Sequence, residues 1–397
     1  MISFLSISAL VAGALALPTS SPLAKRNACA APRLVQYVQT FHTPDNQPLS
    51  LLPLLNDDTG VTHVNLAAIH VNGPGEITLN DASPNDTTWD QMWSDVATLQ
   101  QGGIKVLFMM GGAAAGSYGN LCGSSVPAVI VSTRSDVQEE QESDSSKDES
   151  VYGPLLSTIQ YHNIDGLDLD IEEEVDISCP LALLDRLNSD LGCDFLLTMA
   201  PVGAALVPNN NNPSGFDYPT MDAQANDANR PNGKLVNWYN AQFYNGWGDA
   251  SSDAQYKQFI ASGNWDPSRV NLGVLDNSGD GSAGYVSQSQ LTDVVVQLCT
   301  DYSTFGGVAA WEWFDAGKAD GDANPWQWDQ DISDALYDGV ATAASSKVKR
   351  SGAITEVPWP EEHSVLLQNG VSHFDAVKAL NQTSGDLPQA MHKLNIN

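Results

Sequence analysis

The chain has 397 residues, of which 48 are Asp or Glu and 17 are Lys or Arg, so its formal net charge is −31. This excess of acid argues against binding to nucleic acid or to an anionic membrane surface, because both need clustered Lys and Arg side chains. Hydrophobic residues make up 42% of the chain and charged residues only 16%, a composition that predicts a folded globular protein with a substantial core.

The amino terminus predicts an exported protein. Residues 1–16, MISFLSISALVAGALA, are apolar and end in Ala14-Leu15-Ala16, the small-x-small pattern of a signal-peptidase site. They predict a signal peptide and a secreted, extracellular protein; a buried amino-terminal helix is the alternative. Residues 17–26 end in the dibasic pair Lys25-Arg26 and predict a propeptide.

Strand-like apolar runs recur along the chain, with helical patterns between them. The eight runs are residues 34–39, 62–69, 104–110, 166–171, 195–199, 238–243, 270–274 and 307–311. Helices are predicted at 89–101, 181–191, 251–262 and 287–302. The repeated strand-then-helix order predicts a (β/α)8 TIM barrel forming a single α/β domain over residues 27–340. A doubly wound open sheet is the alternative, disfavoured because no Gly-rich phosphate-binding motif follows the first strand.

Two segments fall outside this order. Residues 132–150, STRSDVQEEQESDSSKDES, are polar and acidic and predict a disordered insertion. Residues 341–397 contain a second dibasic pair, Lys349-Arg350, and no strand-helix unit, so they predict an appended tail with a site for processing. Two sequons, at Asn85 and Asn381, are glycosylation acceptors in a secreted chain.

The run DGLDLDIE at residues 165–172 contains the candidate catalytic carboxyl groups. Side chains alternate along a strand, so Asp168, Asp170 and Glu172 project to one side, while the intervening Leu and Ile residues project to the other. Inside a barrel the three carboxyl groups face the interior, and Glu172 reaches the carboxyl end, where active sites of this fold lie. Negative charges this close together raise the pKa of a neighbouring carboxyl group. A general acid needs such a raised pKa, because it must hold a proton before it can donate one. A solvated acidic strand face or a divalent-metal site is the alternative.

This run resembles the Asp-Gly-x-Asp-x-Asp-x-Glu signature of family 18 glycoside hydrolases, the chitinase family. Gln242-Phe243-Tyr244-Asn245 resembles the sixth-strand motif of the family, and Trp311 resembles its eighth-strand tryptophan. Met109-Met110-Gly111-Gly112 resembles the third-strand Ser-x-Gly-Gly motif, with Met109 in place of the serine. The resemblance covers residues 33–338. Within the family, the segments 51–55, 69–72 and 311–314 are most similar to secreted fungal endo-β-N-acetylglucosaminidases.

The resemblance implies substrate-assisted, retaining hydrolysis. Glu172 is implied as the acid that protonates the glycosidic oxygen, and the acetamido oxygen of the substrate as the nucleophile. Asp170 orients the acetamido group, Asp168 shares a proton with Asp170, and the Tyr244 hydroxyl donates to the acetamido group. These four residues form the predicted catalytic set.

The predicted substrate-binding residues are Trp311, which stacks on a sugar ring, together with Gln242, Tyr37 and Met199 from the strand-like runs. Tyr244 and Trp311 also have a simpler interpretation as buried aromatic residues at strand ends. Trp313 is as compatible with a core position as with the site.

Residues 276–287 match only the first part of a calcium-binding loop pattern. Asp276-x-Ser278-x-Asp280-Gly281 begins like one, but Ser287 stands at the twelfth position, where a bidentate Glu is needed. We therefore expect no required metal and no cofactor.

Five cysteines in a secreted chain allow two disulfides. Cys122 and Cys179 follow neighbouring predicted strands, and Cys29 and Cys299 precede the first and eighth strands, which adjoin when the barrel closes. We expect these two bridges, with Cys193 left free.

The expected partner is a glycan containing N-acetylglucosamine, bound by a monomer. Hydrolysis of GlcNAc-β-1,4-GlcNAc bonds within the N-glycan chitobiose core is favoured over chitin hydrolysis as the implied activity. A catalytically inactive glycan-binding barrel is the third possibility, and the presence of Glu172, Asp170 and Tyr244 argues against it.

Overall fold

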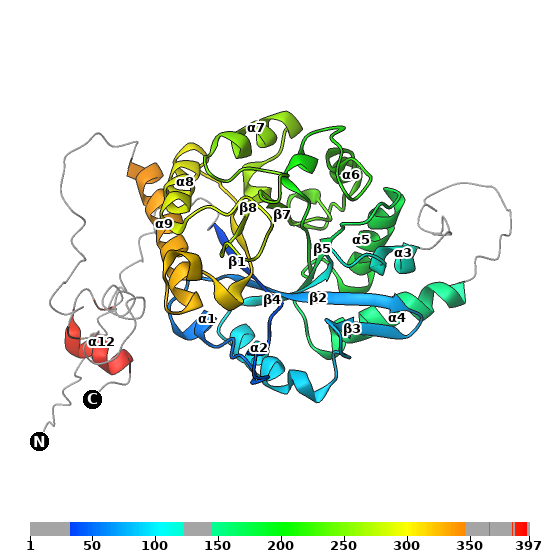
Figure 1. Ribbon diagram of the computed structural model, residues 1–397, viewed down its shortest axis with the longest axis horizontal. Helices are drawn as coiled ribbons and strands as arrows, with labels where there is room; N and C mark the ends of the chain where they lie inside the picture. Colours follow the sequence, from blue (N-terminus) through cyan, green and yellow to red (C-terminus); the bar gives the residue numbers. More distant parts are fainter. Residues whose placement is uncertain (1–31, 123–144, 346–364, 366–382, 384–385, 395–397) are drawn as a thin grey trace, which may run out of the picture.

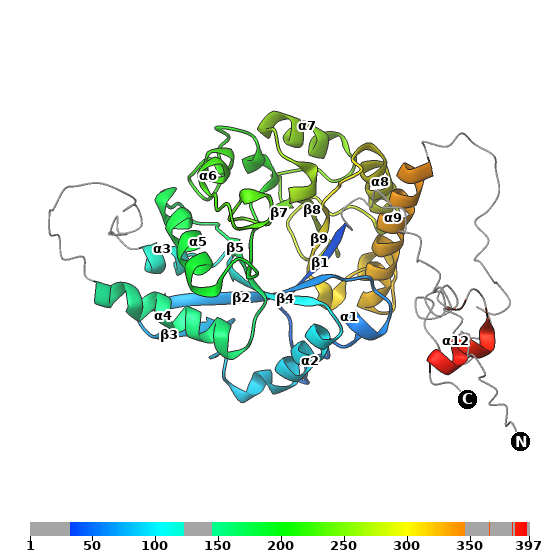
Figure 2. The ribbon, with the colours of Figure 1, turned by 180° about the vertical axis from the view of Figure 1, so that it is seen from behind.

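The computed structural model of the protein describes residues 32–122, 145–345, 365, 383 and 386–394. Its centre is a closed barrel of parallel strands with helices around it (Figures 1 and 2). The barrel strands are β1 (Arg33–Val38), β2 (His63–Gly73), β4 (Lys105–Gly111), β5 (Gly166–Asp170), β6 (Leu196–Met199), β7 (Trp238–Gln242), β8 (Val270–Leu275) and β9 (Gly307–Trp311). Neighbours follow the order β1-β9-β8-β7-β6-β5-β4-β2, and β1 also pairs with β2. The predicted (β/α)8 barrel is confirmed.

The helices alternate with the strands along the chain. The α-helices are α1 (Pro53–Asn56), α2 (Asp90–Gln101), α3 (Ser117–Cys122), α4 (Ser145–Tyr161), α5 (Ser178–Leu191), α6 (Tyr218–Gln224), α7 (Ala254–Gly263), α8 (Gln288–Asp301), α9 (Pro325–Ser345) and α12 (Leu387–Lys393). Short 3-10 helices are η1 (Thr87–Trp89), η2 (Gly203–Leu206), η3 (Pro231–Gly233), η4 (Pro267–Arg269), η5 (Trp313–Asp315) and η6 (Lys318–Asp320).

All eight predicted strands are present, and the four predicted helices correspond to α2, α5, α7 and α8 with ends shifted by at most three residues. The largest difference is at β2, which continues past residue 69 and forms an antiparallel hairpin with the unpredicted strand β3 (Glu76–Leu79). The predicted disordered insertion is wrong at its end, because residues 145–150 form the first turns of α4. Helix α9 runs across the predicted boundary at residue 340.

Several predictions lie outside the described residues. The signal peptide and propeptide fall within residues 1–31, and residues 132–144 of the insertion, most of the tail and the Asn381 sequon are also outside. These stay predictions. The Asn85 sequon lies on an exposed turn before η1.

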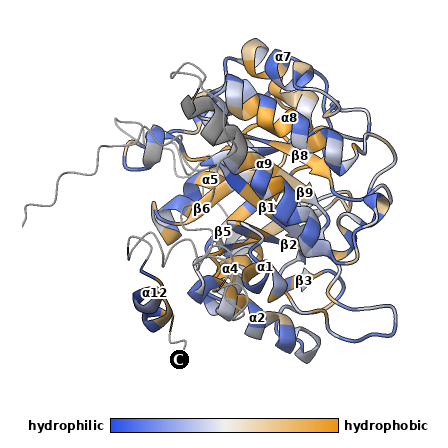
Figure 3. Ribbon diagram, turned by 90° about the vertical axis from the view of Figure 1, so that its left-hand side faces the viewer, coloured by the Kyte–Doolittle hydropathy of each residue, from blue (hydrophilic) through white to orange (hydrophobic). Residues whose placement is uncertain are grey.

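Apolar side chains form two layers, as the alternation of a strand requires. The larger layer lies between the strands and the surrounding helices, and the small inner one contains Val35, Tyr37, Ala67, Ala68, Met109 and Ala309, with Trp311 packed against it. Figure 3 shows β8 as largely hydrophobic, whereas α8 carries both hydrophobic and hydrophilic residues, since a helix on the outside of a barrel has one face on the core and one in solvent.

Barrel closure depends on a glycine at the start of β9. Gly307 pairs with Arg33 of β1 and has a φ of +123°. A Cβ atom at this position would lie 1.9 Å from the Arg33 carbonyl oxygen. Only glycine permits both this backbone conformation and this approach of the first strand to the last.

Within the described residues, no helix is both long enough and apolar enough to cross a lipid bilayer.

Candidate active site

The side chains of β5 alternate between the two sides of the strand, as the sequence predicts. Leu167 and Leu169 pack in the outer apolar layer, so Asp168 and Asp170 face the barrel interior, where both are buried. Strand β5 ends at Asp170. Glu172 follows two residues later and is half-buried, which leaves its carboxyl group open to a ligand at the carboxyl end of the barrel.

Hydrogen-bond donors from three other strands surround Asp168. The Tyr37 hydroxyl donates to Oδ2 of Asp168 at 2.6 Å, and the Thr198 hydroxyl and the Asn240 amide, at 3.2 Å, donate to Oδ1. Complete burial raises the pKa of Asp168 to about 6, although the hydrogen bonds from Thr198, Tyr37 and Asn240 oppose this by stabilising the ionised form. Asp168 is therefore ionised at neutral pH.

Asp170 has fewer donors and two carboxyl neighbours. Nε2 of Gln242 donates to Oδ1 of Asp170 at 3.1 Å and also lies 3.4 Å from Oε1 of Glu172. Burial, followed by the negative charges of Glu172 and Asp168, raises the pKa of Asp170 well above its ordinary value. The arrangement therefore keeps a proton on Asp170 between two groups of like charge.

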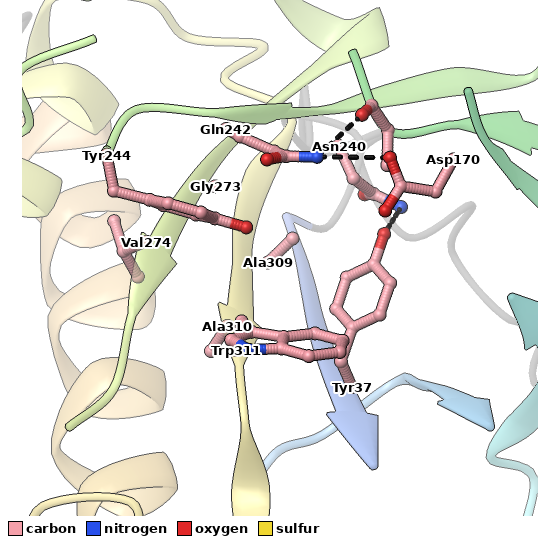
Figure 4. A pocket seen from close by; sticks show the side chains of 11 residues that line it. Tyr37, Asp170, Asn240, Gln242, Tyr244, Gly273, Val274, Ala309, Ala310 and Trp311 are labelled. Carbon is pink, nitrogen blue, oxygen red and sulfur yellow. Dashed lines mark hydrogen bonds between the residues drawn. The ribbon is translucent and has the colours of Figure 1, made fainter. Parts of the chain in front are cut away.

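Gln242 is held so that its amide group reaches both acids. The same Nε2 donates to the Ala200 carbonyl oxygen at 2.9 Å, and the Gln242 backbone N–H donates to the carbonyl of Pro201. The side chain thus links the end of β7 to the residues just after β6, with its amide facing Asp170 (Figure 4).

A pocket opens above these groups. Its lining residues are Tyr37, Asp170, Ala200, Asn240, Gln242, Tyr244, Gly273, Val274, Ala309, Ala310 and Trp311. The Tyr244 hydroxyl points into the pocket, and the half-exposed Trp311 lies beside Tyr37, with ring centroids 5.8 Å apart (Figure 4). Burial, followed by the charges of Asp170 and Glu172, raises the pKa of Tyr244 well above its ordinary value. Tyr244 is therefore a neutral hydroxyl donor at any working pH.

The glycines after β4 let the backbone approach the acids. Gly111 has a φ of +97°, and a Cβ atom there would lie 2.3 Å from the Asp170 carbonyl oxygen. The Gly112 N–H donates to that same carbonyl at 3.0 Å. Met109, which replaces the serine of the family motif, pairs with Asp168 in the ladder and is buried in the inner apolar layer.

Of the predicted site residues, Asp168, Asp170, Glu172, Gln242, Tyr244, Tyr37 and Trp311 are brought together. Met199 is not: it is fully buried in the outer layer, because Thr198 is the residue of β6 that faces inward. A substrate contact by Met199 is therefore not supported. Trp313 is likewise buried in the outer layer.

The sequence analysis did not predict two residues that donate hydrogen bonds to Asp168. Thr198 and Asn240 lie at inward-facing positions of β6 and β7. A polar residue at such a position in an otherwise apolar strand could have indicated them. Glu173 accepts hydrogen bonds from the N–H groups of Gly116 and Tyr118 and so holds the loop after β4. Asp165 holds the start of β4 by accepting from Lys105 and Val106.

The Cys122–Cys179 disulfide is present, with Cα atoms 5.4 Å apart. It joins the end of α3 to the start of α5, so it links the loops that follow β4 and β5. Cys193 is exposed and unpaired, as predicted. Cys299 is buried, and Cys29 lies outside the described residues, so the second predicted bridge stays a prediction. In the part of the chain that is described, no group of three or more His, Cys, Asp or Glu side chains is arranged to bind a metal ion.

Comparison with known proteins identifies the family. The sequence profile described as Glycosyl hydrolases family 18 matches residues 33–338, which include every strand and all the site residues above. The chain belongs to glycosyl hydrolases family 18.

Two solved structures have a similar fold. A fungal endo-β-N-acetylglucosaminidase of glycosyl hydrolase family 18 is 33% identical, with a TM-score of 0.66, over 78% of this chain and 99% of that one. The chitinase ChiC from Aspergillus fumigatus is 40% identical, with a TM-score of 0.63, over 77% of this chain and 99% of that one.

A curated relative, Chitinase 2 of Rhizopus oligosporus, is 26% identical over 272 residues, which are 62% of this chain and 42% of that protein. The chain spans less than half the length of the curated relatives it matches.

Proposed function

We propose that this family 18 protein hydrolyses GlcNAc-β-1,4-GlcNAc bonds with retention of configuration, using the substrate's own acetamido group as the nucleophile. The observation that carries the proposal is the row Asp168, Asp170 and Glu172, with two members buried in the barrel and the third at its open end. The row ends beside a pocket that has a hydroxyl donor, Tyr244, and a half-exposed aromatic side chain, Trp311.

The first step breaks the glycosidic bond. Glu172 gives its proton to the glycosidic oxygen as the acetamido oxygen of the same sugar attacks the anomeric carbon, which forms an oxazolinium ring and releases the leaving sugar. Asp170 accepts from the acetamido N–H, and the proton that it shares with Asp168 moves to Asp168, so that the Asp170 carboxylate stabilises the positive charge that develops on the ring. The Tyr244 hydroxyl donates to the acetamido group.

The second step opens the ring with water. Glu172, now ionised, removes a proton from the incoming water, whose oxygen bonds to the anomeric carbon. The acetamido group is restored and the acid is ready for another cycle. Because the nucleophile is an N-acetyl group, a sugar without one beside the scissile bond is not a substrate, which excludes xylan, cellulose and starch.

Between the two substrates, we favour the chitobiose core of N-glycans. The segments 51–55, 69–72 and 311–314 resemble fungal endo-β-N-acetylglucosaminidases, and one such enzyme has a TM-score of 0.66 with this chain. Chitin or its oligomers are the second candidate, because ChiC from Aspergillus fumigatus is called a chitinase and has the higher identity, 40%. The enzyme is proposed to act outside the cell as a monomer.

The test uses both substrates in parallel. The purified protein is incubated with a high-mannose glycoprotein and with GlcNAc oligomers, and the products of each are followed by mass spectrometry. Cleavage that leaves one GlcNAc on the asparagine supports the first candidate, and shortened oligomers support the second. If neither substrate is cut, the proposed activity is wrong.

The acid is tested by Glu172→Gln, with Glu174→Gln as a matched control two residues further along, where the side chain is exposed. We expect Glu172→Gln to lower kcat by about 10²–10⁴-fold, the usual contribution of general acid catalysis, while sugar binding persists. Near wild-type turnover in this variant would overturn the assignment.

A further inference from the structure

A sequon and an exposed aromatic side chain lie close together on the outside of the barrel. Asn85 and Thr87, the acceptor and the hydroxyl residue of the sequon, are both exposed on the turn that leads into α2. Tyr161, the last residue of α4, is 76% exposed, the highest value for a large apolar side chain among the described residues. Neither feature takes part in the proposed active site.

His162 connects the sequon to Tyr161, although 77 positions separate it from Asn85 in the chain. Oδ1 of Asn85 accepts a hydrogen bond from Nε2 of His162 at 3.0 Å. The His162 ring stacks on that of Trp93, with centroids 3.8 Å apart, and the Tyr161 ring meets it edge-on at 4.9 Å. We call Trp93, Tyr161 and His162 the aromatic platform.

Trp93 holds the sequon and the aromatic platform in a fixed relative position. Its ring supports His162 from below, and its indole N–H donates to the carbonyl oxygen of Pro84, the residue before Asn85, at 2.9 Å. The hydrogen bond from His162 uses the side-chain oxygen of Asn85. It therefore leaves Nδ2, the atom that carries an N-linked sugar, available.

The geometry of an N-glycosidic bond directs a sugar on Asn85 toward the aromatic platform. The sugar replaces one hydrogen of Nδ2 and creates a secondary amide, which prefers the trans arrangement as a peptide bond does. In that arrangement the anomeric carbon lies on the same side of the amide as Oδ1. Because Oδ1 faces His162, the first sugar ring begins beside His162 and next to Tyr161.

We propose that Asn85 carries an N-linked glycan whose innermost GlcNAc packs its apolar face on the ring of Tyr161. The proposal is independent of the catalytic assignments and rests on the predicted export of the chain, because this modification belongs to secreted proteins. The ring of Tyr161 offers an apolar face of the kind on which a sugar ring stacks. The glycan thereby covers an aromatic side chain that is otherwise left in water.

The modification is a group transfer from an oligosaccharide linked to a lipid diphosphate. The bond between Nδ2 of Asn85 and the anomeric carbon forms, the bond between that carbon and the diphosphate breaks, and Nδ2 releases one proton. Helix α4 ends at Tyr161 and β5 begins at Gly166, so the aromatic platform lies near the amino end of β5. The pocket lies at the opposite end of the barrel, and the glycan leaves it open.

The first test measures occupancy of Asn85. The full chain with Glu172→Gln, which cannot shorten its own glycan by the proposed activity, is produced in a secreting fungal host and purified from the medium. Peptides that contain Asn85 are analysed by mass spectrometry. Thr87→Ala removes the sequon but keeps Asn85 and its bond to His162, and Thr87→Ser, which keeps the sequon, is the matched control. We expect sugar on Asn85 in the background protein and in Thr87→Ser, and none in Thr87→Ala.

The second test measures packing by a cycle of Tm values in the same background. We expect Thr87→Ala to lower Tm by about 1–3 °C, as loss of one stacked ring predicts. Combined with Tyr161→Ala, Thr87→Ala should lower Tm by less than half as much, because the stacking partner is already absent. Combined with Tyr161→Phe, which keeps the ring, it should have its full effect. Tyr337→Ala, at another exposed tyrosine, on α9, is the matched control and should also leave the full effect.

Three results overturn the proposal. One is an Asn85 peptide without sugar in the secreted protein. Another is a Thr87→Ala substitution that leaves Tm unchanged or lowers it equally with Tyr161 and with Tyr161→Ala, which means that the glycan does not pack on the aromatic platform. The third is failure of the chain to reach the medium, because the predicted export is then wrong. Hydrolysis by the wild-type protein is measured separately, so none of these results decides the proposed function.

Discussion

The hydroxyl group of Tyr37 lies 2.6 Å from Oδ2 of Asp168, although 131 positions separate the two residues in the chain. The same hydroxyl accepts a hydrogen bond from Nδ2 of Asn240 at 3.0 Å. Tyr37 therefore connects β1, β5 and β7 across the inside of the barrel. Its hydroxyl helps to keep Asp168 ionised, which in turn favours the proton on Asp170.

Tyr37→Phe tests this relationship. Removing the hydroxyl takes away a hydrogen bond that stabilises the ionised form, so the pKa of Asp168 should rise from about 6 by about one unit. The acid limb of the pH profile of kcat should then move to higher pH. The matched control is Tyr256→Phe, because the Tyr256 hydroxyl is also buried but donates to the Val270 carbonyl, away from the site. An acid limb that does not move in Tyr37→Phe would contradict this role.

Met109 stands where the resemblance expects a serine, and its neighbours explain why the serine is dispensable. Both oxygens of Asp168 already accept hydrogen bonds, from Tyr37, Thr198 and Asn240. The Met109 side chain is buried, and its methyl group reaches the vicinity of Gly112. Its contribution is therefore packing inside the barrel.

Met109→Ser should lower the free energy of unfolding by about 2–4 kcal/mol, because it leaves a cavity in the inner apolar layer, and it should bring no gain in kcat. Met109→Leu conserves volume and should cost less than about 1.5 kcal/mol. Urea denaturation and initial rates measure both effects. A serine variant with higher kcat than wild type would mean that Asp168 lacks a donor that the serine supplies.

The sequence predicted the barrel and the inward row of acids because both depend on short-range periodicity. Alternation alone places Asp168 and Asp170 on one face of β5, and it holds wherever the strand lies. The hairpin of β2 and β3 was missed because the predicted strand ended with its apolar run at residue 69, whereas pairing with residues 76–79 extends it.

Side-chain contacts between strands that are far apart in the sequence could not be predicted from the sequence. That Thr198 and Asn240 donate to Asp168 depends on the register between β5, β6 and β7, which no local pattern specifies. Met199 illustrates the same limit: a shift of one residue along β6 decides whether Thr198 or Met199 faces the pocket.

The Cys122–Cys179 disulfide should contribute strongly to stability, because its two cysteines are 57 positions apart in the sequence. Constraining an unfolded chain by a loop of this size is worth about 4 kcal/mol in the chain-entropy model, and native bridges commonly contribute about 2–5 kcal/mol. We expect the double variant Cys122→Ala, Cys179→Ala to unfold at a lower urea concentration by a corresponding amount. Cys193→Ser, at the exposed unpaired cysteine, is the control and should unfold like wild type. Equal midpoints for all three proteins would contradict the prediction.

Asp329 should make the protein more stable in mild acid than at pH 8. It is fully buried between α9 and β1, where its Oδ1 accepts a hydrogen bond from Nε2 of Gln36 at 2.6 Å, and burial raises its pKa to about 8. In the unfolded chain the pKa is about 4. Between these two values the folded protein binds a proton that the unfolded chain has released, so the free energy of unfolding falls as pH rises from about 4 to about 8.

Asp329→Asn removes this titration without changing the shape of the side chain. The Asn amide can also donate to Oε1 of Gln36, which is buried and has no hydrogen-bond partner among the described residues. We therefore expect the Tm of wild type to fall between pH 5 and pH 8, and the Tm of Asp329→Asn to fall less. Each kcal/mol by which the free energies of unfolding of the two proteins differ should change Tm by about 2–4 °C. Asp293→Asn, at an exposed position on α8, should follow the wild-type curve. A fall of Tm with rising pH requires a proton that Asp329 holds in the folded protein and releases on unfolding. If the curves of Tm against pH are parallel for Asp329→Asn and wild type, Asp329 is ionised in the folded protein throughout this range.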